Sequence, residues 1–242
     1  MSNNDQPHLP CAPGLRRAVV TGSSSGIGCA ITAHLLAQGW HVLGLDISAP
    51  AIVHAAFEPV QVDLASRNDI ARVASQCQKV EALIHAAGVL RVGELGQLDP
   101  AAGELMWRLH VEGASCLADV LVPQMAERGQ GRVVFIGSRV AQGMPGRGQY
   151  AATKAALTAL ARSWAAEVAV RGVTVNVVSP AATQTAMLQD PARVGSAPRL
   201  PPLGRLIEPT EIAELVNYLL SPSAAAITGQ DIAICGGSSL PR

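Results

Sequence analysis

The chain has 242 residues, and its 18 lysines and arginines balance 18 aspartates and glutamates, so the formal net charge is zero. Such a chain lacks the positive field that gathers nucleic acid or anionic lipid, and 3% aromatic residues are too few for a base-stacking platform. With 49% hydrophobic and 15% charged residues, the composition is typical of a compact protein and not of a disordered one.

Short β-branched runs alternate with longer alanine-rich segments along the chain. The runs predict strands over residues 17–21, 41–45, 59–62, 82–86, 132–136, 173–178 and 231–235. The segments between them predict helices over residues 27–38, 68–78, 101–128, 149–171 and 210–220, with Gly39 and Gly172 at helix ends. This alternation favours an α/β fold in which helices cover both faces of a parallel sheet. Residues 187–208 are rich in proline and have no period, which predicts a substrate-binding loop.

The two ends and the cysteines give expectations about location. Residues 1–14 lack the charged-then-apolar order of a signal peptide and predict a polar tail, followed by one domain over residues 15–242. No apolar stretch reaches the roughly 20 residues that a membrane helix needs. The five cysteines contain no CxxC pair, so we expect no disulfide framework and no metal site. We expect a cytoplasmic protein with no membrane or nucleic-acid partner.

A glycine-rich turn, TGSSSGIG, follows the first predicted strand at residues 21–28. Glycine has no Cβ to hold a phosphate away, so backbone amides and the positive end of a helix dipole can approach it closely. The spacing is GxxxGxG and not the usual GxGxxG, and an ordinary strand-to-helix connection is the alternative. We expect the turn to bind the pyrophosphate of a dinucleotide through Gly22, Ser25, Gly26, Ile27 and Gly28.

Asp46 lies 24 residues beyond Gly22, after the second predicted strand. An acidic residue there accepts hydrogen bonds from both hydroxyls of an adenosine ribose and repels a 2′-phosphate. The next residues, Ile47 and Ser48, supply no cation to reverse this preference. The pattern therefore favours NAD over NADP, and a simple turn or capping aspartate is the alternative.

Tyr150 and Lys154 are four positions apart on a predicted helix, which puts both side chains on one face. A nearby ammonium favours the phenolate and lowers the pKa of a phenol, so a tyrosine placed in this way can act as a general base near neutral pH. Ser138 follows the predicted strand 132–136, at the end of a parallel strand where ligands bind, and its hydroxyl can donate to a substrate oxygen. A lone Tyr-x-x-x-Lys pair is usually a surface pair, but this context favours catalysis.

The motifs TGSSSGIG, HAAG, IGS, YAATK, VNVVSP and ITGQDIAICGG, in this order, resemble the short-chain dehydrogenase/reductase family over residues 16–237. The resemblance implies a single-domain Rossmann fold with a doubly wound, seven-stranded parallel sheet, assembled as a homotetramer or homodimer. It implies that Tyr150 is the acid/base, that Ser138 positions the substrate oxygen, and that Lys154 binds the nicotinamide ribose and tunes the tyrosine. By family position, further cofactor contacts fall to Asp63, Leu64, Ala87, Gly88, Pro180 and Thr183.

Two departures from the family pattern involve histidines. His85 and Ala86 stand where the family has asparagines, so one hydrogen bond of that turn is missing or replaced. His110 stands in place of the fourth catalytic residue, an asparagine that supports a water chain carrying the proton from the lysine to solvent. A histidine can hold water and titrates near about 6.5, so we predict that His110 serves this relay with altered pH dependence. A packed core histidine is the alternative.

Segments 87–93 and 202–205 look like those of 2,3-dihydro-2,3-dihydroxybenzoate dehydrogenases, which oxidise a cyclic dihydrodiol carboxylate with NAD. Arg91, Arg139 and Arg147 are candidates to bind such a substrate, because a guanidinium matches a carboxylate in bidentate fashion. Ordinary surface arginines are the alternative.

Two other functions stay open. Segments 136–138 and 175–178 support a ketone reductase of the 3-oxoacyl-carrier-protein type, although such reductases usually prefer NADPH. The other is a nucleotide-sensing regulator without catalysis. Such proteins typically lose the tyrosine or the lysine, whereas this chain retains Ser138, Tyr150 and Lys154.

Overall fold

The computed structural model describes residues 16–189 and 199–240. Its centre is a seven-stranded parallel sheet in the order β3-β2-β1-β4-β5-β6-β7. The strands are β1 (Arg17–Thr21), β2 (His41–Asp46), β3 (Phe57–Gln61), β4 (Ala82–His85), β5 (Gly131–Ile136), β6 (Val173–Pro180) and β7 (Asp231–Ile234). The chain builds outward from β1 to β3, returns to β4 beside β1, and then builds outward on the other side. This reversal makes the sheet doubly wound and confirms the predicted Rossmann-like fold.

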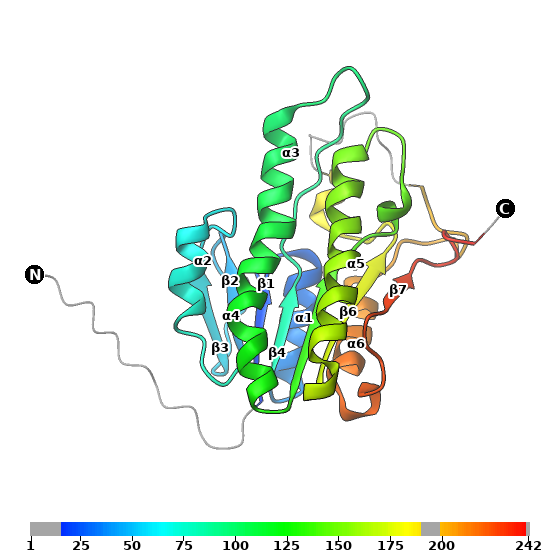
Figure 1. Ribbon diagram of the computed structural model, residues 1–242. Coiled ribbons are helices and arrows are strands. Elements are labelled where there is room, and N and C mark those ends of the chain that lie inside the picture. Colours follow the sequence, from blue (N-terminus) through cyan, green and yellow to red (C-terminus); the bar gives the residue numbers. More distant parts are fainter. Residues whose placement is uncertain (1–15, 190–198, 241–242) are drawn as a thin grey trace, which may run out of the picture.

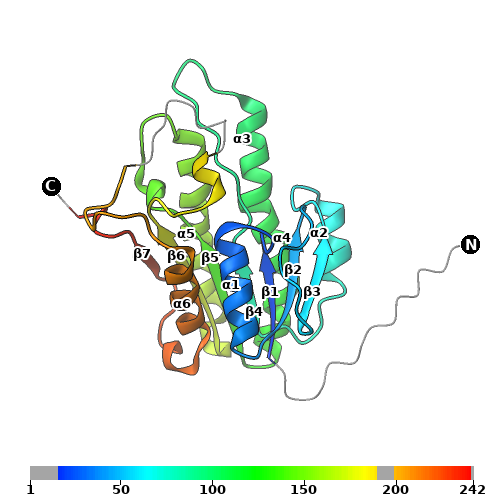
Figure 2. The same cartoon turned by 180° about the vertical axis from the view of Figure 1, so that it is seen from behind.

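Helices cover both faces of this sheet, as the two opposite views show (Figure 1, Figure 2). One face is covered by α1 (Gly26–Ala37) and α6 (Pro209–Leu220), and the other by α2 (Arg67–Ala74), α4 (Gly113–Glu127) and α5 (Gly148–Val168). Side chains of β5 alternate between the two cores: Phe135 joins the core under α4 and α5, whereas Val134 and Ile136 join the core under α1 and α6. This is why the strand is apolar at each position from Val133 to Ile136.

The predicted helix over residues 101–128 is interrupted in the structure. Regular helix is confined to α3 (Pro100–Trp107) and α4, and the residues between them, Arg108–Glu112, form a π-helical turn. A π-helical turn inserts an extra residue into the helix and is often found at functional sites. Hydrophobic periodicity does not report such a local change in hydrogen bonding, so the sequence predicted one continuous helix.

The other elements lie close to the predicted ranges. β3 begins at Phe57 and not at 59, and α2 ends at Ala74 and not at 78. The predicted substrate loop over 187–208 begins inside a short 3-10 turn, Ala186–Gln189, and a bridge between Thr183 and Ile207 closes its base. The predicted tail and residues 190–198 of that loop lie outside the described residues.

Two further observations concern the described residues only. The four described cysteines, which are Cys29, Cys77, Cys116 and Cys235, form no disulfide. No helix in this part of the chain combines the length and the apolar character needed to cross a membrane.

The two predicted helix-end glycines give a matched stability test. Gly39 and Gly172 both have a left-handed backbone, with φ of 77° and 74°. A Cβ at Gly39 would meet no atom within 4 Å, whereas a Cβ at Gly172 would lie 2.2 Å from the carbonyl oxygen of Gly129. We predict that Gly39→Ala lowers the free energy of unfolding by about 1 kcal/mol, the strain of the left-handed conformation. Gly172→Ala should cost at least about 2 kcal/mol because it adds a steric clash. Equal losses in urea denaturation would contradict this.

Candidate active site

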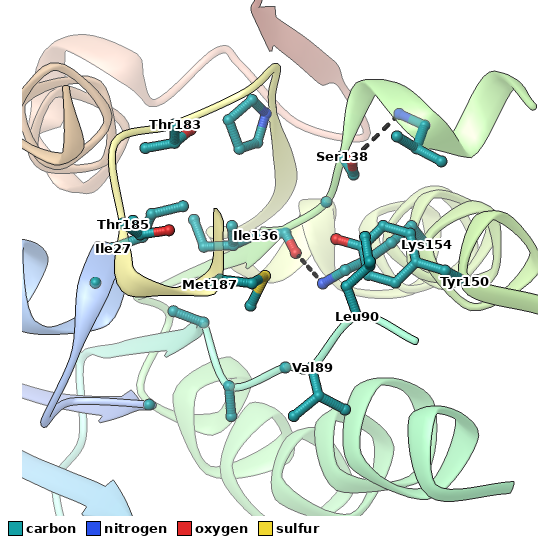
Figure 3. A pocket seen from close by; sticks show the side chains of 18 of the residues that line it. Ile27, Val89, Leu90, Ile136, Ser138, Tyr150, Lys154, Thr183, Thr185 and Met187 are labelled. Atoms are coloured by element: carbon teal, nitrogen blue, oxygen red, sulfur yellow. Dashed lines mark hydrogen bonds between the residues drawn. The ribbon is translucent and has the colours of Figure 1, made fainter. Parts of the chain in front are cut away.

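The carboxyl ends of the strands open onto one large cavity of about 1310 Å³. Its walls come from the glycine turn after β1, the end of β2, the loop after β4, the end of β5, the first turns of α5 and the segment after β6 (Figure 3). Doubly wound sheets bind ligands at this edge, where the strand order reverses. Here the reversal lies between β1 and β4, so the topology places the cavity where the predicted motifs meet.

The glycine turn is as tight as the sequence suggested. A Cβ at Gly28 would lie 2.1 Å from the carbonyl oxygen of Gly22, and a Cβ at Gly22 would lie 3.0 Å from the backbone of Ala87. Five residues of the turn line the cavity beside the N-terminus of α1, namely Gly22, Ser25, Gly26, Ile27 and Gly28. Close backbone approach at a helix N-terminus fits the pyrophosphate of a dinucleotide.

Asp46 lies at the far end of the same cavity, where β2 ends. Its Oδ2 accepts a hydrogen bond from the Ser24 amide at 2.9 Å, and its Oδ1 accepts one from the Ser48 amide at 2.8 Å. These bonds fix the carboxylate and still leave lone pairs on both oxygens. The fixed carboxylate therefore fits a ribose diol and opposes a 2′-phosphate.

The other expected cofactor residues line the same cavity, which brings Asp63, Leu64, Ala87, Gly88, Pro180 and Thr183 together from three segments. Gly88 is packed closely, because a Cβ there would lie 2.9 Å from Nε2 of His110 and 3.6 Å from Nζ of Lys154. The residues present thus form a continuous lining from Asp46 to Lys154, as a dinucleotide site requires.

Tyr150 and Lys154 project from one face of α5 into the cavity, beside Ser138 (Figure 3). The Lys154 ammonium lies 5.8 Å from the centre of the Tyr150 ring and donates a hydrogen bond to the Ile136 carbonyl at 2.8 Å. Burial lowers the pKa of Lys154 to about 8. The Ser138 Oγ accepts from the Val140 amide at 3.2 Å, and the side chain lines the cavity. This hydroxyl is therefore placed to donate to a ligand.

His110 does not line the cavity, although the sequence suggested a catalytic role. Its ring is fully buried behind Tyr150, and the two rings meet edge to face with centres 5.6 Å apart. Nε2 accepts from the Val89 amide at 3.0 Å, and Nδ1 is bonded to the Thr153 hydroxyl at 2.8 Å. Burial, together with the nearby Lys154 and His85, lowers the pKa of His110 well below its usual value. With both nitrogens bonded to protein, the structure does not support the predicted water relay, and the alternative of a packed core histidine describes it better.

Among the residues that the structure describes, three arginines line the cavity, but they are not the three that the sequence suggested. Arg139 and Arg147 line it as predicted, whereas Arg91 is not among the lining residues; its guanidinium donates a hydrogen bond to the Leu90 carbonyl. Arg199 lines the cavity and was missed. It lies in the predicted loop, where no periodicity shows which side chains point inward. The apolar wall near these arginines includes Val89, Leu90, Leu105, Met144, Met187 and Leu200.

The fold and this cavity define a nucleotide-binding oxidoreductase, and comparisons identify its family. Residues 22–239 match the family model described as enoyl-(acyl carrier protein) reductase. The chain is 34% identical to 2,3-dihydro-2,3-dihydroxybenzoate dehydrogenase and 35% identical to 3-oxoacyl-(acyl-carrier-protein) reductase FabG, both of Escherichia coli (strain K12); each match covers 91% of this chain and 96% of the relative.

A solved structure titled short chain dehydrogenase/reductase family protein superimposes with a TM-score of 0.85 at 34% identity, covering 93% of this chain and 97% of the other. The chain therefore belongs to the short-chain dehydrogenase/reductase family, an oxidoreductase family that uses a nicotinamide cofactor.

The buried ammonium of Lys154 predicts a pH-dependent stability. The folded protein gives up this proton near about pH 8, whereas the unfolded chain keeps it up to about 10.5, so raising the pH between these values favours the folded state. We predict that the free energy of unfolding rises by about 2 kcal/mol between about pH 7 and about pH 9.5, relative to Lys154→Met. Denaturant unfolding of both proteins at the two pH values measures the difference, and parallel pH profiles would contradict the prediction.

Proposed function

We propose that this protein is an NAD-dependent dehydrogenase that interconverts a secondary alcohol and a ketone, and that it oxidises a cyclic dihydrodiol such as 2,3-dihydro-2,3-dihydroxybenzoate. The observation that carries the proposal is one cavity with Ser138, Tyr150 and Lys154 at one end and the fixed Asp46 carboxylate at the other. The 34% identity to a dehydrogenase of that name supports the substrate class.

In this proposal, side chains of the protein accept the substrate proton and donate a hydrogen bond to the substrate oxygen. Tyr150, as phenolate, takes the proton of the substrate hydroxyl, and the Lys154 ammonium on the same helix face favours that phenolate. Ser138 donates its hydroxyl hydrogen to the substrate oxygen as the carbonyl forms. The bound nicotinamide supplies the hydride acceptor for the carbinol carbon. Loss of one hydride and one proton turns the alcohol into a ketone.

The substrate end of the cavity supports an anionic ring substrate. Arg139, Arg147 and Arg199 carry positive charge there, next to the apolar wall of Val89, Leu90, Leu105, Met144, Met187 and Leu200. A guanidinium pairs with a carboxylate, while the wall accommodates the face of a ring. In a dihydrodiol, oxidation of one carbinol gives a ketone; the neighbouring carbinol carbon then loses its proton and the ketone oxygen gains one, which gives an aromatic catechol and makes the oxidation nearly irreversible.

The alternative is a ketone reductase of the 3-oxoacyl-carrier-protein type. It is supported by relatives with that name at 30–35% identity. The same three side chains would run the reaction in reverse, with Tyr150 donating its proton. An NAD-reduction screen over cyclic dihydrodiols, secondary alcohols, sugars and hydroxysteroids, beside an oxidation screen over 3-oxoacyl thioesters, separates the two. NAD binding without any turnover would support the nucleotide-sensing regulator.

Tyr150→Phe tests the catalytic assignment. Removing the phenol oxygen takes away the proton acceptor, so kcat should fall at least about a hundredfold. The dissociation constant for NAD, measured by fluorescence titration, should change little. The chain has one other tyrosine, which is half-exposed, so Tyr218→Phe is a matched control that should keep full activity. Retained turnover in Tyr150→Phe would contradict the assignment.

Asp46→Ala tests the cofactor. The unchanged protein should bind NADH at least about tenfold more tightly than NADPH, because a 2′-phosphate would face the carboxylate. Asp46→Ala should weaken NADH binding and reduce this preference. Glu127→Ala, which removes an exposed carboxylate that does not line the cavity, should leave both affinities unchanged. Equal affinity for the two cofactors in the unchanged protein would refute the NAD proposal.

The assembly as a homotetramer or homodimer and the cytoplasmic location stay predictions.

A further inference from the structure

His85 and His110, the two departures from the family pattern, form parts of one hydrogen-bond network. His85 ends β4, and its Nε2 lies 3.2 Å from the carbonyl oxygen of Leu109 in the π-helical turn. His110, the next residue of that turn, reaches back to the Val89 amide in the loop after β4. The strand end thus bonds to the turn, and the turn bonds to the loop that follows the strand. These reciprocal bonds hold the loop of residues 86–90, hereafter the β4 loop, which lines the cavity.

The partners determine where the proton of each ring lies. A backbone amide can only donate, so Nε2 of His110 is an acceptor and Nδ1 carries the hydrogen that bonds to Thr153. Thr153 in turn donates its hydroxyl hydrogen to the Tyr150 carbonyl at 2.8 Å. His110 is therefore neutral and in its Nδ1–H form.

His85 has the opposite form. The Leu109 carbonyl can only accept, so Nε2 carries the hydrogen, and Nδ1 accepts from the Thr21 hydroxyl at 3.1 Å. Thr21 Oγ1 also accepts from the amides of Ala86 and Ala87, both at 3.0 Å. Burial and the nearby Lys154 charge lower the pKa of His85 to about 3, which agrees with a neutral ring.

The network connects three parts of the active site. It begins at Thr21, beside the glycine turn, passes through the β4 loop and the π-helical turn, and ends at Thr153, between Tyr150 and Lys154 on α5. We propose that His85 and His110 act together as a neutral clamp that positions the β4 loop against the catalytic helix, and that His110 is a positioning residue and not a proton carrier. Only the kinetic tests of this clamp rest on the proposed dehydrogenase function; the spectroscopic test does not.

The first test needs no substrate. In the ¹⁵N-histidine-labelled full chain, long-range ¹H–¹⁵N spectra distinguish the two neutral forms and the protonated ring, and His85→Asn and His110→Asn assign the two signals. The clamp requires Nε2–H at His85 and Nδ1–H at His110, unchanged from about pH 8 to about pH 5.5. A protonated, mixed or reversed form at either ring in that range overturns the proposal, whether or not the protein is a dehydrogenase.

The second test removes one bond while conserving shape. Thr153→Val keeps the volume of the side chain but cannot bond to His110, so kcat should fall about tenfold. The dissociation constant for NAD should change less than about threefold, because the glycine turn and Asp46 are untouched. Thr153→Ser keeps the hydroxyl and should restore kcat. Unchanged kcat in Thr153→Val would overturn the clamp.

His110→Asn separates positioning from proton transfer, because an amide can accept from Val89 but cannot titrate. We expect the pH profile of kcat to keep its shape in this variant. If the rise or the fall of kcat with pH disappears in this variant, the imidazole carries a proton during turnover, and this would overturn the proposal. If no substrate is found, the proposed function fails while the spectra still decide on the clamp.

Discussion

The hydroxyl of Thr21, fully buried at the end of β1, joins the two halves of the active site. It accepts hydrogen bonds from the amides of Ala86 and Ala87 and donates one to His85. These three bonds use both lone pairs and the single hydrogen of the hydroxyl. The glycine turn continues at the next residue, Gly22, where an added Cβ would lie 3.0 Å from the backbone of Ala87. The side chain of Thr21 therefore bonds to the β4 loop at the point where the glycine turn comes closest to that loop.

The site tolerates two buried histidines because burial and a nearby buried cation both keep the rings neutral. Burial opposes protonation of both His85 and His110 and lowers their pKa values, and the charge of Lys154 acts in the same direction. Neutral rings supply one acceptor and one donor each, which is what the amide and the carbonyl beside them require. The only cation in this group is therefore Lys154, on the face of α5 that also carries Tyr150. That charge remains available to favour the phenolate.

The parts of the site that could be predicted depend on local chemistry. Close backbone approach requires glycine at Gly22 and Gly28, the spacing of Tyr150 and Lys154 places both on one helix face, and Asp46 follows its strand directly. The parts that could not be predicted depend on distant partners. His110 is explained by Val89 and Thr153, which are far away in the sequence, and no local pattern reports a π-helical turn. Likewise, whether Arg91 or Arg199 faces the cavity depends on loop conformation.

The neutral net charge of the chain conceals a cavity with two different ends. A fixed carboxylate, Asp46, lies at one end, while Lys154, Arg139 and Arg147 lie toward the other, and the N-terminus of α1 lies between them. A dinucleotide matches this order of charges in one orientation only. Its uncharged ribose hydroxyls then lie at Asp46, its pyrophosphate at the N-terminus of α1, and its reactive ring near the cationic end, where an anionic substrate is proposed to bind. Reversing the ligand would place the pyrophosphate away from the helix terminus and the proposed substrate anion near Asp46. The distribution of charge therefore favours the orientation of the cofactor before Tyr150 or Ser138 makes any contact with the substrate.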